Sequence, residues 1–245
     1  MQERFERAAL HVVGLLRAEF GTELVGLLLG GSVAAGTPLP RSDLDIYVLI
    51  RSAWRQRRAL SVDGVPVELF INPVAQIRRE FHDTEHPSTF AMFATGQALY
   101  DPDGAVAQLA EEARRVWTSP RPAVSAEMAQ RLRYRLSDLL DDTRDLAEVD
   151  DVGAAYLVGI TLDAALEAHY RLQRRWAVKP KYVLDDLEKH APHLVPLVAA
   201  AVTKPMRERL AALTSLVDEV LAPVGGTLLA WTTPQEPTTA GPHPP

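Results

Sequence analysis

Residues 24–50 read LVGLLLGGSVAAGTPLPRSDLDIYVLI, and this stretch decides the fold. It begins with the apolar run Leu24–Leu29 and ends with a second one, Ile46–Ile50, and the loop between them is rich in glycine and proline. Short apolar runs bounded by turn residues are typical of buried strands. We therefore expect two buried strands joined by a loop that carries polar groups.

Two acidic residues stand at the start of the second strand. Asp43 and Asp45 are two positions apart, so in an extended chain their side chains point to one face, roughly 6–7 Å apart. Leu44 and Ile46 point the opposite way, toward the core. Neighbouring carboxylates repel each other and burial of either charge is costly, so a counter-charge is expected. Hard oxygen ligands of this kind suit Mg²⁺ best.

The loop between the two runs begins with Gly30-Gly31-Ser32. Glycine allows a tight turn and lets backbone N–H groups approach an anion closely. If the segment after Ser32 opens as a helical turn, its N-terminus can bind phosphate, and the Ser32 hydroxyl adds a hydrogen bond. A phosphate cradle would then face the pair of carboxylates. This combination suits the transfer of a phosphate-bearing group.

The stretch Gly31–Asp45 reads GSVAAGTPLPRSDLD. A Gly-Ser pair followed at this spacing by Ser-Asp-x-Asp, between two apolar runs, resembles the DNA polymerase β-like nucleotidyltransferase superfamily. The spacing is most similar to its small bacterial branch, the aminoglycoside nucleotidyltransferases and their relatives. The resemblance implies transfer of a nucleoside monophosphate, by default AMP from ATP, to a hydroxyl of a small molecule such as an aminoglycoside. It implies two Mg²⁺ ions held by Asp43 and Asp45, and nucleotide binding by Gly31, Ser32 and Ser42.

Glu68 is a third candidate carboxylate. It follows the hairpin signal Asp63-Gly64 and lies in a strand whose apolar residues share the opposite face. An acid in the middle of an apolar strand is costly unless it is paired. In the resembled family a third carboxylate on the neighbouring strand completes the metal site and is the catalytic base in some members, and Glu68 matches that position. Pro66 leaves an exposed Glu68 on an edge strand as the alternative.

Beyond residue 118 the character of the chain changes. The sequence TSPRP at 118–122 is typical of a linker, and long helical patterns follow it. We predict an α+β fold. Its catalytic domain, residues 1–118, would hold a mixed sheet of about four to five strands flanked by helices, followed by a helical bundle over 119–231 on the acceptor side. The proline-rich tail, 232–245, is expected to be disordered.

The helical region holds candidates for the acceptor and nucleotide sites. Asp163 and Glu167 lie one turn apart on an otherwise apolar helix and are candidates for acceptor binding or for a general base. A simple polar stripe is the alternative. The segment WAVKPKY resembles a stretch of related enzymes in which a lysine reaches the nucleotide phosphates, and here Lys179 or Lys181 matches it. A solvated lysine near a turn is the alternative.

Composition limits the partners. The 245 residues carry a net charge of −6, include no cysteine and show no long basic tract, so we expect no nucleic-acid partner. The short basic segment 52–60, with Arg55, Arg57 and Arg58, predicts a solvated face on a short helix or loop, and contact with a triphosphate is the alternative. No apolar run reaches the ~18 residues of a membrane span. We expect a soluble cytoplasmic protein, and the sequence does not indicate its oligomeric state.

Two alternative functions stay open. A protein adenylyltransferase of the antitoxin type would share the motif, although such proteins are usually shorter and lack the attached helical bundle. A non-catalytic nucleotide-binding module would share the fold, although a degraded site would be expected to lose one of its three acids. Measuring nucleotide binding and turnover side by side distinguishes the binding module from an enzyme.

Overall fold

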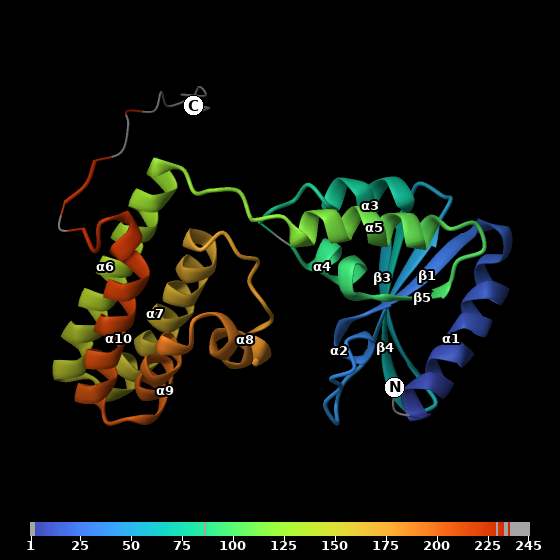
Figure 1. The fold of residues 1–245 in the computed structure, drawn as a ribbon. Helices are drawn as coiled ribbons and strands as arrows, with labels where there is room; N and C mark the ends of the chain where they lie inside the picture. The colour runs from blue at the N-terminus through green and yellow to red at the C-terminus, as the bar shows by residue number, and fades with distance from the viewer. Residues whose placement is uncertain (1–2, 86, 229, 233–234, 236–245) are drawn as a thin grey trace, which may run out of the picture. The chain divides into compact units, whose positions relative to one another are not determined.

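The computed structural model describes residues 3–85, 87–228, 230–232 and 235. The packing of the backbone divides the chain into two compact units, Met1–Pro120 and Arg121–Pro245 (Figure 1). Each unit has its own hydrophobic core, and each is described by itself. The tail predicted to be disordered lies outside the described residues, apart from positions 232 and 235. The functional roles assigned to 1–118 and 119–231 stay predictions.

A five-stranded mixed sheet forms the centre of the first unit, in the order β3-β4-β2-β1-β5. Strands β2 and β4 are parallel, and the other neighbouring pairs are antiparallel. The strands are β1 (Leu24–Gly30), β2 (Leu44–Ile50), β3 (Gln56–Val62), β4 (Val65–Pro73) and β5 (Gln97–Tyr100). The sheet and the helical second unit confirm the predicted α+β fold.

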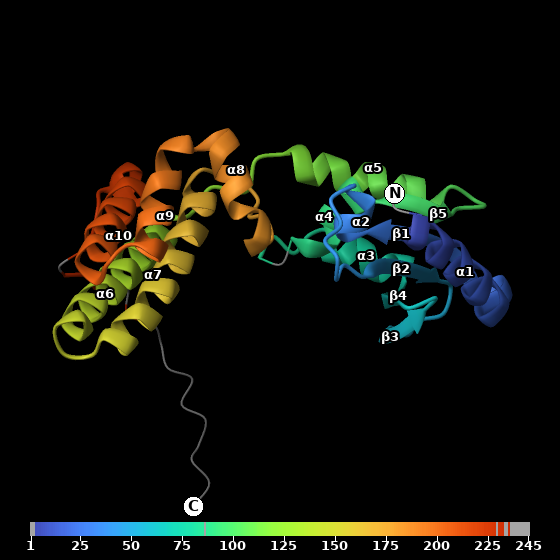
Figure 2. The same ribbon diagram turned by 90° about the horizontal axis from the view of Figure 1, so that it is seen from below.

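Helices cover both faces of this sheet (Figures 1 and 2). On one face α1 packs its apolar stripe against Leu44, Ile46 and Leu69, which point into the same core. On the other face Tyr47 makes an edge-on contact with Phe93, at 5.0 Å between ring centroids. The helices are α1 (Glu3–Phe20), the short α2 (Gly31–Ala34), α3 (Val74–Glu80), α4 (Ser88–Thr95) and α5 (Ala105–Thr118). The polar side chains of β2 therefore share a face with Tyr47 and not with α1.

The prediction of a short helix or loop over residues 52–60 is partly wrong, because residues 56–62 form the edge strand β3. An edge strand needs few apolar residues, and charged side chains protect it from pairing with other chains. Its charged sequence therefore concealed its extended conformation. The hairpin signal was right: Val62 pairs with Val65 across a turn in which Asp63 and Gly64 have φ of 51° and 75°.

The second unit is a helical bundle, as predicted. Its helices are α6 (Ala126–Val149), α7 (Asp151–Leu172), α8 (Val183–His190), α9 (Val195–Thr203) and α10 (Met206–Leu221). Local sequence sets the starts of the two longest helices, α6 and α7. The Ser125 hydroxyl accepts from the Met128 N–H at 3.1 Å, and the Asp150 carboxylate accepts from the N–H groups of Val152 and Gly153. Pro205 separates α9 from α10.

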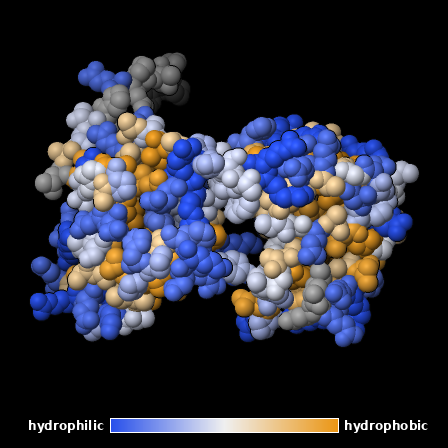
Figure 3. Space-filling view, viewed as in Figure 1, coloured by the Kyte–Doolittle hydropathy of each residue, from blue (hydrophilic) through white to orange (hydrophobic). Residues whose placement is uncertain are grey.

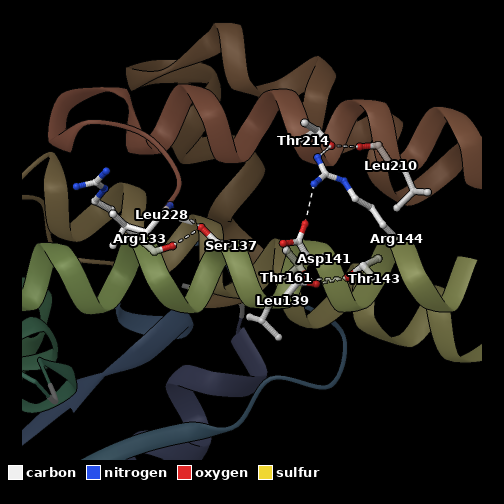
Figure 4. Close-up of polar contacts among 10 residues, drawn as sticks. All are labelled: Arg133, Ser137, Leu139, Asp141, Thr143, Arg144, Thr161, Leu210, Thr214 and Leu228. Carbon is white, nitrogen blue, oxygen red and sulfur yellow. Dashed lines mark hydrogen bonds and ion pairs between the residues drawn. The ribbon is translucent and has the colours of Figure 1, made fainter. Parts of the chain in front are cut away.

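Hydroxyl groups link the long helices of this bundle (Figure 4). The Thr143 and Thr161 hydroxyls lie 3.2 Å apart between α6 and α7, and both residues are fully buried. The Arg144 guanidinium donates to the Thr214 hydroxyl of α10 at 3.2 Å and pairs with Asp141, both on the exposed side of the bundle. The bond between Thr143 and Thr161 satisfies hydroxyl groups that would otherwise be costly inside the bundle.

The outer surface is mixed in character. The visible faces of both units show mostly hydrophilic residues, with smaller hydrophobic areas between them (Figure 3). Among the described residues, no helix is both long enough and apolar enough to cross a bilayer.

His169 of α7 makes the stability of the second unit dependent on pH. Its side chain is 6% exposed, and within the described residues its Nε2 has no hydrogen-bond partner. Burial lowers the pKa of His169 below its usual value, and Arg175 and His193 lower it further while Asp186 opposes them. In the unfolded chain the His169 imidazole therefore binds a proton near pH 6.5, whereas in the folded chain it does so only at lower pH. Stability is lost as the pH falls below that value, at up to about 1.4 kcal/mol per pH unit.

His169→Leu should reduce this loss. Urea denaturation at pH 7.5 and 5.5 should show a smaller acid-induced drop in unfolding free energy for the variant than for the wild type. His82→Gln, which changes an exposed imidazole of the first unit, is the matched control and should show the same acid-induced drop in unfolding free energy as the wild type. Equal acid sensitivity of His169→Leu and wild type would contradict this prediction.

Candidate active site

Three carboxylates converge at one end of the sheet. Asp43, Asp45 and Glu68 each offer an oxygen, and these three oxygens lie within 4.8 Å of one another. Asp45 is 7% exposed, and the other two are half-buried. The three residues predicted to form the metal site are therefore neighbours, on the face opposite the α1 core.

The register of the sheet produces this arrangement. Asp45 pairs with Glu68 across the parallel β2–β4 ladder, and residues paired directly in a ladder project from the same face. Asp45 also lies opposite Gly30 in the antiparallel pairing with β1. The first turn of α2 thus begins beside the carboxylates.

Gly31 is required at this point for two reasons. Its φ is +68°, a conformation that other residues rarely adopt. A Cβ atom at Gly31 would also overlap the Asp45 carboxylate. The backbone of the Gly-Ser loop therefore approaches the acid more closely than any side chain would allow.

Ser32 and Ser42 hold the loop that connects β1 to β2. Their hydroxyls lie 3.0 Å apart, and the Ser42 hydroxyl also accepts from the Leu39 N–H at 2.8 Å. Both serines are buried. Their bonds give them a part in fixing the loop, and their predicted contact with a nucleotide stays a prediction.

Arg57 is a neighbour of the site, and the sequence did not reveal its contact with Glu68. Its Nε donates to Glu68 Oε1 at 2.6 Å, and its guanidinium lies 4.9 Å from the centroid of the Phe70 ring. The Glu68 carboxylate raises the pKa of Arg57 above its usual value, so the guanidinium stays charged. Period-two alternation over residues 56–62 was the available signal, because it would have placed Arg57 on the same face as Phe70.

A pocket of about 370 Å³ adjoins the carboxylates on this face of the sheet. Arg57 connects the two, because it contacts Glu68 and lines the pocket. The pocket is lined by Arg55, Gln56, Arg57, Phe70, Asn72 and Glu80. Behind it, desolvation raises the pKa of the buried Tyr47 hydroxyl to about 12, and this hydroxyl donates to the Thr89 hydroxyl at 3.3 Å. Tyr47 therefore stays protonated at neutral pH.

The carboxylate cluster fits a hard divalent cation. Three like charges at these separations repel one another, and a bound cation relieves the repulsion. Each residue contributes carboxylate oxygens, the ligands that Mg²⁺ prefers. Asp43, Asp45 and Glu68 would hold the ion, with Arg57 positioned to compete for Glu68.

The other predicted site residues belong to the second unit. Asp163 and Glu167 lie on α7, one turn apart, and both line a pocket of that unit. Lys179 precedes and Lys181 follows Pro180, which lines the same pocket. Their predicted contacts with acceptor and nucleotide stay predictions.

Comparisons with known proteins give limited information. No protein-family model matches the chain, and no curated protein matches it. Among solved structures it is similar to the crystal structure of a nucleotidyltransferase-like protein from Exiguobacterium sibiricum 255-15. The sequences are 12% identical, and the alignment covers 89% of this chain and 75% of that chain with a TM-score of 0.49. A likeness at this level assigns no function.

Proposed function

We propose that the chain is a magnesium-dependent nucleotidyltransferase that moves a nucleoside monophosphate from a nucleoside triphosphate to a hydroxyl of a small molecule. The convergence of Asp43, Asp45 and Glu68 within 4.8 Å is the observation that carries this proposal. The backbone turn at Gly31, pressed against Asp45, adds support because it brings polar backbone groups to the same place. Transfer of AMP from ATP and an aminoglycoside acceptor are finer proposals that rest on the sequence resemblance.

In the proposed reaction, the acceptor oxygen forms a bond to the α-phosphorus and the bond from that phosphorus to the bridging oxygen breaks. Pyrophosphate leaves with the bonding electrons, and the acceptor hydroxyl gives up its proton. Magnesium bound at the site would act as a Lewis acid and stabilise the negative charge on the phosphate oxygens. Asp43 and Asp45 would hold the magnesium, Glu68 is the candidate base for the acceptor proton, and Arg57 orients Glu68 through its ion pair with that carboxylate.

A screen of pyrophosphate release tests the proposal. The full chain is incubated with Mg²⁺, each of the four ribonucleoside triphosphates and acceptors that include aminoglycosides, hydroxylated amines and a model protein. Release that requires both metal and a small-molecule acceptor supports the proposal. Nucleotide binding without turnover of any acceptor would overturn it in favour of a binding module, and transfer to protein alone would favour the antitoxin-type alternative.

Arg57→Ala should tighten the binding of Mn²⁺, used as a spectroscopic substitute for Mg²⁺. The wild-type guanidinium, 68% exposed, places a positive charge on a metal-ligating carboxylate. Unit charges about 4 Å apart in water interact by ~1 kcal/mol, so we expect an affinity gain of up to about fivefold. Electron paramagnetic resonance of free Mn²⁺ measures it.

Arg58→Ala is the matched control for this measurement. Arg58 is the next residue of the same edge strand, but it points to the other face and pairs with Glu19 at 2.9 Å. Its removal should leave Mn²⁺ affinity unchanged. Equal affinities for Arg57→Ala and Arg58→Ala would show that Arg57 does not compete for Glu68.

A further inference from the structure

The largest pocket described in the second unit lies against α7. It has a volume of about 440 Å³, within the range of small-molecule sites. All of its lining residues belong to this unit: Gly159, Leu162, Asp163, Leu166, Glu167, Tyr170, Ala177, Val178, Pro180, Val183, Leu184 and Val198. The α7 residues recur every three or four positions, so they form one continuous face of the helix.

Most of the pocket wall is apolar, and its charges are acidic. Only Asp163 and Glu167 carry charge. Apart from these two and Tyr170, the lining residues are aliphatic, proline or glycine. Glu167 is engaged by Arg171, whose Nε donates to it at 3.1 Å, and by Arg135 at 3.7 Å. Asp163 is exposed, and over the described part of the chain it has no hydrogen-bond or ion-pair partner. The pocket therefore offers apolar walls and one available negative charge, that of Asp163.

Gly159 is an unusual residue for the middle of a helix. Glycine is less favourable than alanine inside a helix, and nothing in the surrounding structure requires it. A Cβ atom at this position would meet no heavy atom within 4 Å, and the φ is not in the left-handed region. What distinguishes the position is that it lines the pocket, one turn before Asp163. Any side chain at 159 would extend into space that the glycine leaves open beside the available carboxylate.

From these three observations we infer that the pocket binds a small organic cation, a single ammonium group on an apolar body, with the ammonium at Asp163. The apolar body removes the aliphatic walls from water, and the charge pairs with the carboxylate. A polyhydroxylated polycation would instead place hydroxyl groups against apolar walls, where they lose hydrogen bonds. That this ligand is the acceptor for transfer rests on the proposed function and would replace the aminoglycoside that the sequence resemblance suggests. Its binding to the pocket does not rest on that function.

Binding of 4-phenylbutylamine to the full chain tests the inference by calorimetry. The probe pairs an ammonium with an apolar body, and 4-phenylbutanol and 4-phenylbutyrate are the neutral and anionic controls. We expect the amine to bind up to about fivefold more tightly than the alcohol, because ion pairs at exposed carboxylates are screened by water. The butyrate should bind most weakly. Equal affinities for amine and alcohol, or tighter binding of kanamycin than of the amine, would overturn the inference.

Two substitutions locate the binding. Gly159→Leu should abolish binding of the amine and the alcohol alike because its side chain occupies the pocket. Gly14→Leu is the matched control, because Gly14 is also a helix glycine whose Cβ would meet nothing within 4 Å, and it lies in α1 of the first unit. Asp163→Asn should reduce amine affinity to that of the alcohol. Unchanged amine binding in both Gly159→Leu and Asp163→Asn would show that this pocket is not the site.

Two further variants are controls, one for unfolding of the leucine variant and one for loss of the proposed transfer activity. Gly159→Ala should raise the unfolding midpoint, because it improves helix propensity, and it keeps the inference testable if the leucine variant unfolds. In that case the alanine variant should weaken binding of amine and alcohol equally, and no weakening would count against the pocket. Asp45→Asn, which disables the proposed transfer chemistry, should bind 4-phenylbutylamine normally. A failed transfer assay with intact amine binding thus refutes the proposed function alone.

Discussion

Asp45→Asn should lower metal-dependent nucleotidyl transfer by about a hundred- to a thousand-fold or more, which is the cost of removing one preorganised electrostatic group from an active site. Asp45 is the most buried of the three acids, and it lies between Gly31 and Glu68. Asparagine keeps the shape of the side chain but removes a charge from a site where like charges repel. The fold should therefore be retained, with an unfolding midpoint equal to or above that of the wild type.

Pyrophosphate release and urea denaturation, measured on one preparation, check this prediction. Asp103→Asn is the control, because Asp103 belongs to the same unit but is 69% exposed and pairs with Arg51 at 3.6 Å. Its activity should equal that of the wild type. Retained transfer in Asp45→Asn would contradict the proposed site, and a lowered midpoint would contradict the expectation that the carboxylate is strained by its neighbours.

Gly31→Ala should damage both stability and metal binding. A non-glycine residue at φ +68° costs about 1–3 kcal/mol, and the added Cβ must push the Asp45 carboxylate aside. Displacing a metal ligand by disturbing its surroundings typically costs about 10–100-fold in affinity. We therefore expect a lower urea midpoint together with Mn²⁺ affinity weakened at least about tenfold.

Gly104→Ala separates the two effects. Gly104 also has a positive φ, +76°, but a Cβ there would meet nothing within 4 Å. The Gly104→Ala variant should lose stability only because alanine is strained at a positive φ, and it should bind Mn²⁺ as the wild type does. If both variants lose stability and neither loses metal affinity, the contact between Gly31 and Asp45 has no role in shaping the site.

The central strands could be predicted from sequence because their signals are local. The apolar runs of β1 and β2 end in turn residues, and Asp63-Gly64 marks the hairpin between β3 and β4. The alternation of β4 placed Glu68 on the face away from the apolar residues, which is where it lies. These features depend on a few neighbouring residues, so a single sequence reveals them.

The role of Arg57 could not be predicted because it depends on partners that are distant in sequence. Its contact with Glu68 follows from the register of β3 on β4, and the charged sequence of the edge strand concealed that strand. The pocket on α7 was missed for a similar reason. Asp163 and Glu167 were identified, but the walls formed by Val178 and Leu184 come from segments whose folding against α7 no local pattern encodes.

The parallel pairing of β2 with β4 has a consequence for insertions and deletions in this chain. Because side chains alternate along β4, gain or loss of one residue between Val65 and Glu68 would turn the third acid toward α1 and expose an aliphatic neighbour instead. The connection from β2 to the edge strand β3, around residues 51–55, carries no such restriction on its length. Natural length variation should therefore be tolerated in this connection and excluded from the four residues before Leu69.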